Sequence, residues 1–114
     1  MKSPYESGKT SIEVFKCDGD LNAQAMVTFK NKVRKLMNKN HKKVLLDLSK
    51  TKHVDLAGLG ILVERIKKIR AVDGDIKLCN VQPQVDATFR LVGVSKLIES
   101  FPTREEAIRS FKVA

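Results

Sequence analysis

The sequence predicts an α/β protein, in which amphipathic helices pack on a mixed, mostly parallel β-sheet. Three observations lead to this prediction. The chain has 114 residues, a common size for one domain. Short apolar runs of strand length alternate along it with longer segments of helical periodicity. The connections are short, and no repeat, linker or low-complexity stretch interrupts the order. We therefore assign residues 1–114 to a single domain, with about residues 1–10 as an N-terminal lead-in.

The first predicted strand lies within residues 10–17, where side chains alternate and place Ile12 and Phe15 on opposite faces. Residues 18–22, DGDLN, then turn the chain. From Ala23 to about Asn38, apolar residues recur at helical spacing opposite a lysine-rich face. This pattern predicts an amphipathic helix.

The second strand is predicted within residues 42–49, a continuous apolar run typical of a strand that is buried on both faces. The next helix should begin at or just after Asp55. Its predicted buried stripe consists of Leu59, Leu62, Val63, Ile66 and Ile69. Its predicted solvent-facing residues are Arg65, Lys67 and Lys68.

The remaining elements follow in the same order. Residues 76–81 form a predicted strand, and Pro83 suits the first turn of a helix that Gly93 ends. Residues 96–101 predict a short helical turn that passes into a last strand. Thr103, with a glutamate three residues later, has the pattern of a capping box before a final helix.

The composition indicates a globular cytoplasmic protein. The chain has no apolar run long enough to span a bilayer, and its first residues lack the apolar stretch of a secretory signal, so we expect no membrane insertion. Cys17 and Cys79 are far apart and lack metal-binding spacing. We expect both to be buried, reduced thiols.

The formal net charge of +9 is compatible with a nucleic acid, an anionic membrane surface or an acidic protein as partner. The lysines, however, are spread along the chain and mostly occupy the polar faces of the predicted helices. Aromatic residues do not alternate with them as they do in RNA-binding sheets. We therefore predict a solvated basic surface and no direct binding of nucleic acid.

The sequence offers little for catalysis or metal binding. His53 and Asp55 could share a metal, but no further ligands lie near them in the sequence. No pattern of nucleophile and base, and no pair of carboxylates, stands out. We therefore expect no enzyme, no metal and no cofactor.

The segment VDLAGLG, residues 54–60, places two glycines at the N-terminal start of a segment with a clear helical pattern, although glycine disfavours helices. Asp55 suits the N-cap, since its carboxylate can accept the backbone N–H of Ala57 or Gly58. Gly58 and Gly60 leave the first turn without side chains. Two interpretations stay open: a partner approaches this backbone closely, or the helix packs tightly on its own sheet. No G-K-[ST] follows, so the segment is not a phosphate-binding P-loop.

The segments VLLDLSKTKHVDLAGLGILVERIKKIR and GDIKLCNVQPQVDATFRLVGVSKLIESFPTREEAI resemble the STAS domain of anti-sigma factor antagonists. The resemblance covers nearly the whole chain from Gly19 onward and keeps the family's order of landmarks. These landmarks are Gly19 to Asn22, Asp55 to Gly60, Asn80-Val81, Leu91 to Gly93 and Glu105 to Ala107.

The resemblance implies a regulator that binds an anti-sigma factor, a histidine-kinase-like ATPase that is also a serine kinase, and so frees a sigma factor for transcription. That kinase phosphorylates a serine or threonine directly after the signature aspartate. Here Leu56 follows Asp55, and Ala57 follows Leu56, so the usual acceptor is absent. Ser49 and Thr51, in the preceding loop, are weak substitute candidates.

We predict that the partner docks on the start of this helix together with the earlier turn. The predicted partner-binding residues are Asp20, Leu21, Asn22, Asp55, Leu56, Ala57, Gly58 and Gly60. Asn22 stands where many relatives carry an acid. Leu56 has two possible roles: a fixed apolar contact for the partner, or a side chain tucked against the sheet.

Two further functions are compatible with the resemblance. One is an accessory subunit of a membrane lipid-transport ABC ATPase, with which Ala57 before Gly58 agrees. The other is a scaffold subunit of a stress-signalling complex, assembled with other STAS proteins.

Overall fold

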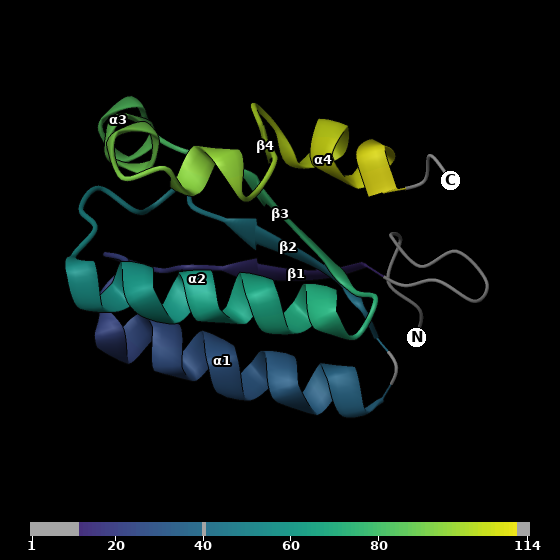
Figure 1. Cartoon of the computed structure of the whole chain (residues 1–114). Coiled ribbons are helices and arrows are strands. Elements are labelled where there is room, and N and C mark those ends of the chain that lie inside the picture. Colours follow the sequence, from purple (N-terminus) through teal and green to yellow (C-terminus); the bar gives the residue numbers. More distant parts are fainter. Residues whose placement is uncertain (1–11, 40, 112–114) are drawn as a thin grey trace.

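The computed structural model describes residues 12–39 and 41–111, so the predicted lead-in lies outside the described residues. Strands and helices alternate along the chain (Figure 1). The strands are β1 (Ile12–Lys16), β2 (Lys43–Asp47), β3 (Asp75–Cys79) and β4 (Ser100–Phe101). The helices are α1 (Ala23–Asn38), α2 (Leu56–Ala71), α3 (Pro83–Leu91), the short 3-10 helix η1 (Val94–Lys96) and α4 (Arg104–Phe111).

The four strands form one sheet in the order β1-β2-β3-β4, and every neighbouring pair is parallel. Phe15, Leu46 and Leu78 are aligned across the first three strands. The predicted α/β fold with a largely parallel sheet is therefore confirmed. Because the strand order follows the chain, right-handed crossovers place α1, α2 and α3 on the same face.

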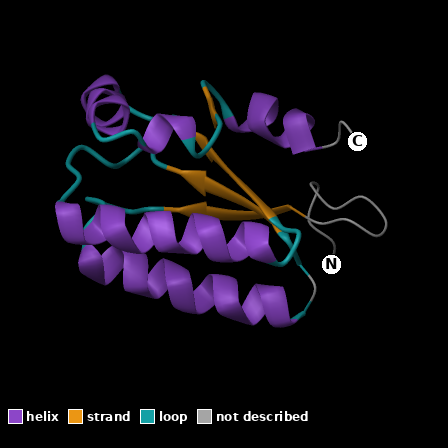
Figure 2. Ribbon diagram, in the orientation of Figure 1, coloured by secondary structure: helices purple, strands orange, loops and turns teal. Residues whose placement is uncertain are grey.

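The two faces of the sheet bury separate groups of apolar side chains. Phe15 and Leu46 face the cluster to which α1, α2 and α3 contribute, whereas Ile12 and Leu45 face the cluster under α4. Figure 2 shows the strands between the long helix pair α1 and α2 on one side and α4 on the other. The predicted alternation along β1 is confirmed, since Ile12 and Phe15 lie on opposite faces.

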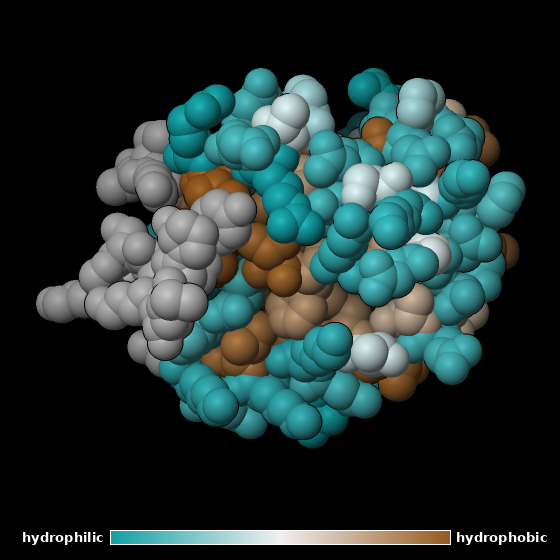
Figure 3. Space-filling view, turned by 180° about the vertical axis from the view of Figure 1, so that it is seen from behind, coloured by the Kyte–Doolittle hydropathy of each residue, from teal (hydrophilic) through white to brown (hydrophobic). Residues whose placement is uncertain are grey.

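Apolar side chains also reach the surface. Seen from behind, the molecule shows a central patch of apolar side chains between two hydrophilic borders (Figure 3). Single exposed apolar residues occur elsewhere as well, and among the large apolar side chains of the described residues the two most exposed are Leu56 and Leu91.

The predicted ends of the helices agree with the structure because capping residues mark them locally. Helix α1 begins at Ala23 after the cap Asn22, and α2 begins at Leu56 after the cap Asp55. Gly93 follows α3 with a φ of 84°, a left-handed conformation that favours glycine. The N–H of Glu106 donates to the hydroxyl of Thr103, as the capping box predicts. Both cysteines are buried and free, as expected.

Arg65 corrects one expectation. It was predicted to face water with Lys67 and Lys68, but it is only 5% exposed, while those two lysines are exposed. Helical geometry places Arg65 on the same stripe as Leu62 and Ile69, so its aliphatic stem is buried. Its guanidinium reaches Glu64, with 3.3 Å between Nη2 and Oε1.

Candidate functional site

The starts of α1 and α2 lie together at the carboxyl edge of the sheet. Each helix follows a strand of the same parallel sheet, so both connections emerge at that edge (Figure 1). Ligands and partners of open α/β sheets commonly bind there. The two segments that the sequence proposed as a docking surface are therefore neighbours in space.

Asp55 forms the N-cap of α2. Its backbone is extended, and its carboxylate accepts the N–H of Gly58 with 2.7 Å between the heavy atoms. The carboxylate satisfies one of the free N–H groups of the first turn and complements the positive end of the helix dipole. Of the two partners that the sequence allowed, Ala57 and Gly58, it is Gly58 that donates.

Asn22 is the N-cap of α1. Its side-chain oxygen accepts the N–H of Ala25 at 2.9 Å. Asparagine and aspartate are about equally good N-caps. The amide that stands here in place of an acid therefore still starts α1.

Backbone hydrogen bonds join the two helix starts. The N–H of Leu21 donates to the carbonyl of His53 at 2.9 Å, and the N–H of Asp55 donates to the carbonyl of Leu21 at 3.1 Å. The N–H of His53 also donates to a carboxylate oxygen of Asp20 at 3.2 Å. The turn before α1 and the loop before α2 thus form one continuous unit.

Gly58 lies where this unit is tightest. A Cβ on Gly58 would be 2.5 Å from the backbone oxygen of Leu21 and 2.9 Å from the Cα of Asn22. The close approach that Gly58 permits is therefore made by the protein's own turn. This corrects the interpretation that Gly58 opens the helix to a partner.

Gly60 behaves differently. No atom lies within 4 Å of the position that a Cβ on Gly60 would take, and the residue is exposed. Of the two glycines, Gly60 alone leaves the surface of the first turn open.

The side chains of the predicted docking residues divide into an inward and an outward group. Leu56 is 80% exposed, which answers whether it tucks against the sheet or faces outward. Ala57 and Asp20 are exposed as well. Leu21, also a predicted partner-binding residue, is fully buried, so its side chain belongs to the core and is not available to a partner. Asp55, the cap of α2, is exposed too, and we call the outward group, Asp20, Asp55, Leu56, Ala57 and Gly60, the α2 docking surface.

The two substitute phosphoacceptors have different environments. Thr51 is fully buried, and its hydroxyl donates to the carbonyl of Gly19 at 2.7 Å. A kinase cannot reach that hydroxyl in this fold, so Thr51 is removed as a candidate. Ser49 is half-buried, and its N–H donates to the carboxylate of Asp47 at 2.9 Å.

Asp47, which the sequence analysis did not single out, is a buried carboxylate at the end of β2. Its oxygens accept hydrogen bonds from Nε of Arg104 at 2.7 Å and from Nδ2 of Asn80 at 3.3 Å. Burial alone would raise the pKa of Asp47, but the bonds from Arg104, Ser49 and Asn80 together hold that pKa below its ordinary value. An acidic residue inside an apolar strand is the sequence signal that could have found it.

No metal site is assembled in the part of the chain that the structure describes. Within residues 12–39 and 41–111, no three His, Cys, Asp or Glu side chains gather as a metal site. Burial raises the pKa of the Cys79 thiol to about 12, so this cysteine stays protonated at neutral pH. No described helix has the length and apolar character needed to cross a membrane.

Comparisons with known proteins agree with this architecture. The family model described as the STAS domain matches residues 7–107. The protein named "Putative anti-sigma factor antagonist BtrV", from Bordetella bronchiseptica, is 31% identical over 78 residues, which cover 68% of this chain and 67% of that protein.

Two solved structures have a similar fold. The crystal structure of a "putative anti-sigma factor antagonist" from Thermotoga maritima has a TM-score of 0.79 and 24% identity, and the match covers 87% of this chain and 86% of that one. A sulfate transporter family protein from Wolinella succinogenes has a TM-score of 0.81 and 15% identity, with 98% and 97% covered.

Proposed function

The chain belongs to the STAS domain family, and we propose that it is an anti-sigma factor antagonist that binds an ATP-binding anti-sigma factor in the cytoplasm. The name of the relative BtrV supports this class of partner. The residues at the carboxyl edge of the sheet support binding rather than catalysis. They present an apolar side chain, a bare helical turn and two capped helix starts, and no nucleophile paired with a base.

The observation that carries the proposal is the exposure of Leu56. A leucine that is 80% exposed stands at the first position of a capped helix, with the open position Gly60 one turn further on. Apolar side chains presented on an ordered helix start serve as anchors when a partner buries them. We propose that Leu56 is the central contact of the α2 docking surface.

We further propose that binding is not switched by phosphorylation at this site. Leu56 and Ala57 have no hydroxyl, and the hydroxyl of Thr51 is buried. A phosphoryl group would add about −1.5 to −2 charges, which a close-packed interface beside Asp55 would repel. Without an acceptor, the antagonist stays competent to bind.

The proposal is tested by binding to the anti-sigma factor. Leu56→Glu should weaken binding by more than about 2 kcal/mol, the usual scale of an interface hot spot, because it introduces a carboxylate at the centre of the contact. Lys67→Glu is the matched control, since Lys67 is exposed on the same helix about three turns away. Isothermal titration calorimetry measures both. Equal loss in the two variants, or loss only in Lys67→Glu, would place the interface elsewhere.

The absence of a switch is tested with the kinase activity of the partner. With partner and ATP, the wild-type chain should take up no phosphate, whereas Leu56→Ser should gain one phosphate on the new serine. Mass spectrometry of the intact protein and of its peptides measures this. Phosphate on Ser49 of the wild-type chain would show that the switch has moved.

The partner class is tested by affinity capture. The protein expected to be captured is a histidine-kinase-like ATPase. Capture of an ABC transporter ATPase would favour an accessory subunit instead. Capture of other STAS proteins alone would favour a scaffold.

A further inference from the structure

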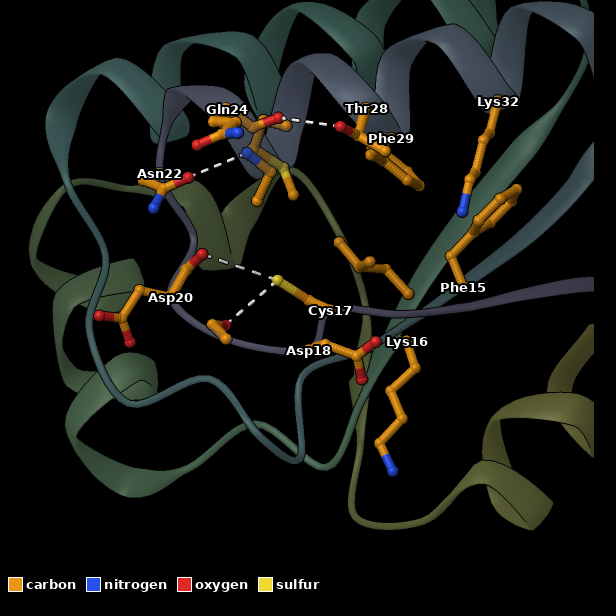
Figure 4. A pocket seen from close by; sticks show the side chains of 14 residues that line it. Phe15, Lys16, Cys17, Asp18, Asp20, Asn22, Gln24, Thr28, Phe29 and Lys32 are labelled. Atoms are coloured by element: carbon orange, nitrogen blue, oxygen red, sulfur yellow. Dashed lines mark hydrogen bonds between the residues drawn. The ribbon is translucent and has the colours of Figure 1, made fainter.

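A cavity of about 370 Å³ lies between β1 and α1, beside the turn before α1 (Figure 4). Its walls come from β1, from residues 17–20 and Asn22, from the first turns of α1 and from Leu46 of β2. The volume falls within the range of small-molecule sites. We call this cavity the β1–α1 pocket.

The floor of the pocket is apolar and held by the core. Met26, Phe29 and Leu46 each line it although they are at most 4% exposed. Phe15 packs on Phe29 edge to face, with ring centroids 5.5 Å apart and an interplanar angle of 85°. Such a floor offers a rigid contact to the apolar part of a ligand.

One charged side chain points into the pocket. Four charged residues line it, but Figure 4 shows Lys16 and Asp18 on the side of β1 away from Phe15. The carboxylate of Asp20 turns to the N–H of His53. Lys32 instead extends from α1 toward Phe15 (Figure 4). It forms no ion pair with any residue in the described ranges.

Several polar groups around the pocket already have partners in the chain. The thiol of Cys17 donates to the carbonyl of Gly19 at 3.3 Å, and the hydroxyl of Thr28 donates to the carbonyl of Gln24 at 3.2 Å. The side-chain oxygen of Asn22 caps α1. A single free ammonium and few free donors suit one negative charge, and they do not suit a polyphosphate, which needs several donors and cations.

We propose that the β1–α1 pocket binds a small amphipathic organic monoanion. The apolar body of the ligand lies against Phe15 and Phe29, and its negative group pairs with the ammonium of Lys32. The pocket shares Asp20 with the α2 docking surface, but Leu56 does not line it, and the proposal does not depend on the proposed function.

The test uses three probes of equal chain length: octanoate, octan-1-ol and octylammonium, each below the concentration at which it forms micelles. They are titrated into the full, isotopically labelled chain, and backbone amide chemical shifts are followed by NMR. Octanoate should give saturable shifts at Phe15, Cys17 and Phe29. It should bind about fivefold more tightly than octan-1-ol, the gain expected from one partly exposed ion pair. Octylammonium should bind more weakly than either.

Two variants identify the charge that is responsible. Lys32→Gln should lower the affinity for octanoate about fivefold and leave that for octan-1-ol unchanged. Lys35→Gln is the matched control, because Lys35 is exposed on the same helix and does not line the pocket. The proposal is overturned if octanoate gives no saturable shifts at these residues. It is also overturned if Lys35→Gln lowers the affinity for octanoate as much as Lys32→Gln does. The loss would then come from the reduced positive charge of the whole surface and not from Lys32.

Discussion

The first turn of α2 has an inward side and an outward side that differ in what surrounds them. On the inward side, Gly58 touches the turn at Leu21, and a single added carbon would overlap that backbone. On the outward side, Gly60 has open space, and Leu56 stands almost fully exposed. One short motif therefore combines residues that build the fold with residues that are free to bind. Substitutions on the two sides should separate stability from binding.

Gly58→Ala should have the largest effect on stability. The new methyl group would lie 2.5 Å from the oxygen of Leu21, which also accepts the N–H of Asp55. Relief would require the two helix starts to move apart, and overpacking of this kind costs about 3 kcal/mol. Urea denaturation should show a loss of that size in the free energy of unfolding. A loss below about 1 kcal/mol would mean that the inward side is not tightly constrained.

Thr51→Val should have the next largest effect. The substitution keeps the shape of the buried side chain but removes the hydrogen bond to the carbonyl of Gly19. The free energy of unfolding should fall by about 1–2 kcal/mol. Thr88→Val is the control, since the hydroxyl of Thr88 donates only within its own helix, to the carbonyl of Gln84. Similar losses in both variants would show that the turn has no special dependence on Thr51.

Gly60→Ala should act in the opposite direction to Gly58→Ala. The added methyl meets nothing within 4 Å, and alanine is favoured over glycine inside a helix. The free energy of unfolding should rise by up to about 1 kcal/mol. Thermal denaturation of this variant beside Gly58→Ala gives a direct measure of the contrast between the two sides. Destabilisation by Gly60→Ala would contradict the inferred contrast between the inward and the outward side of the turn.

Leu56→Glu should have the smallest effect on stability. An exposed side chain has few contacts to lose, and a carboxylate is acceptable at the start of a helix. The free energy of unfolding should change by less than about 0.5 kcal/mol. Circular dichroism during urea denaturation checks this, and the result also shows that any loss of partner binding does not come from unfolding.

The predictions from sequence succeeded where the signal was local. Asn22 and Asp55 cap their helices because a capping residue acts within three positions of itself. The alternation along β1 identified both of its faces for the same reason. The resemblance to STAS domains added two further predictions, a docking segment at the start of α2 and the loss of the phosphoacceptor at Leu56, and the proposed experiments test both.

The errors arose where a residue's environment comes from a distant segment. The sequence near Gly58 does not reveal that Leu21 and Asn22 pack against it. Arg65 was assigned to water because of its charge, although helical periodicity placed it on the buried stripe. Asp47 was missed because its partner Arg104 comes from the last helix.

The joining of the two helix starts has a consequence for how fast and how tightly a partner can bind. The turn before α1 and the loop before α2 are held together by backbone hydrogen bonds and by the contact at Gly58. Their conformational entropy is therefore lost when the chain folds rather than when the complex forms. A partner meets a surface that is already ordered, so little of its interaction free energy is used to immobilise this protein. Association should then proceed by docking of preformed surfaces, without a slow rearrangement on this side of the complex.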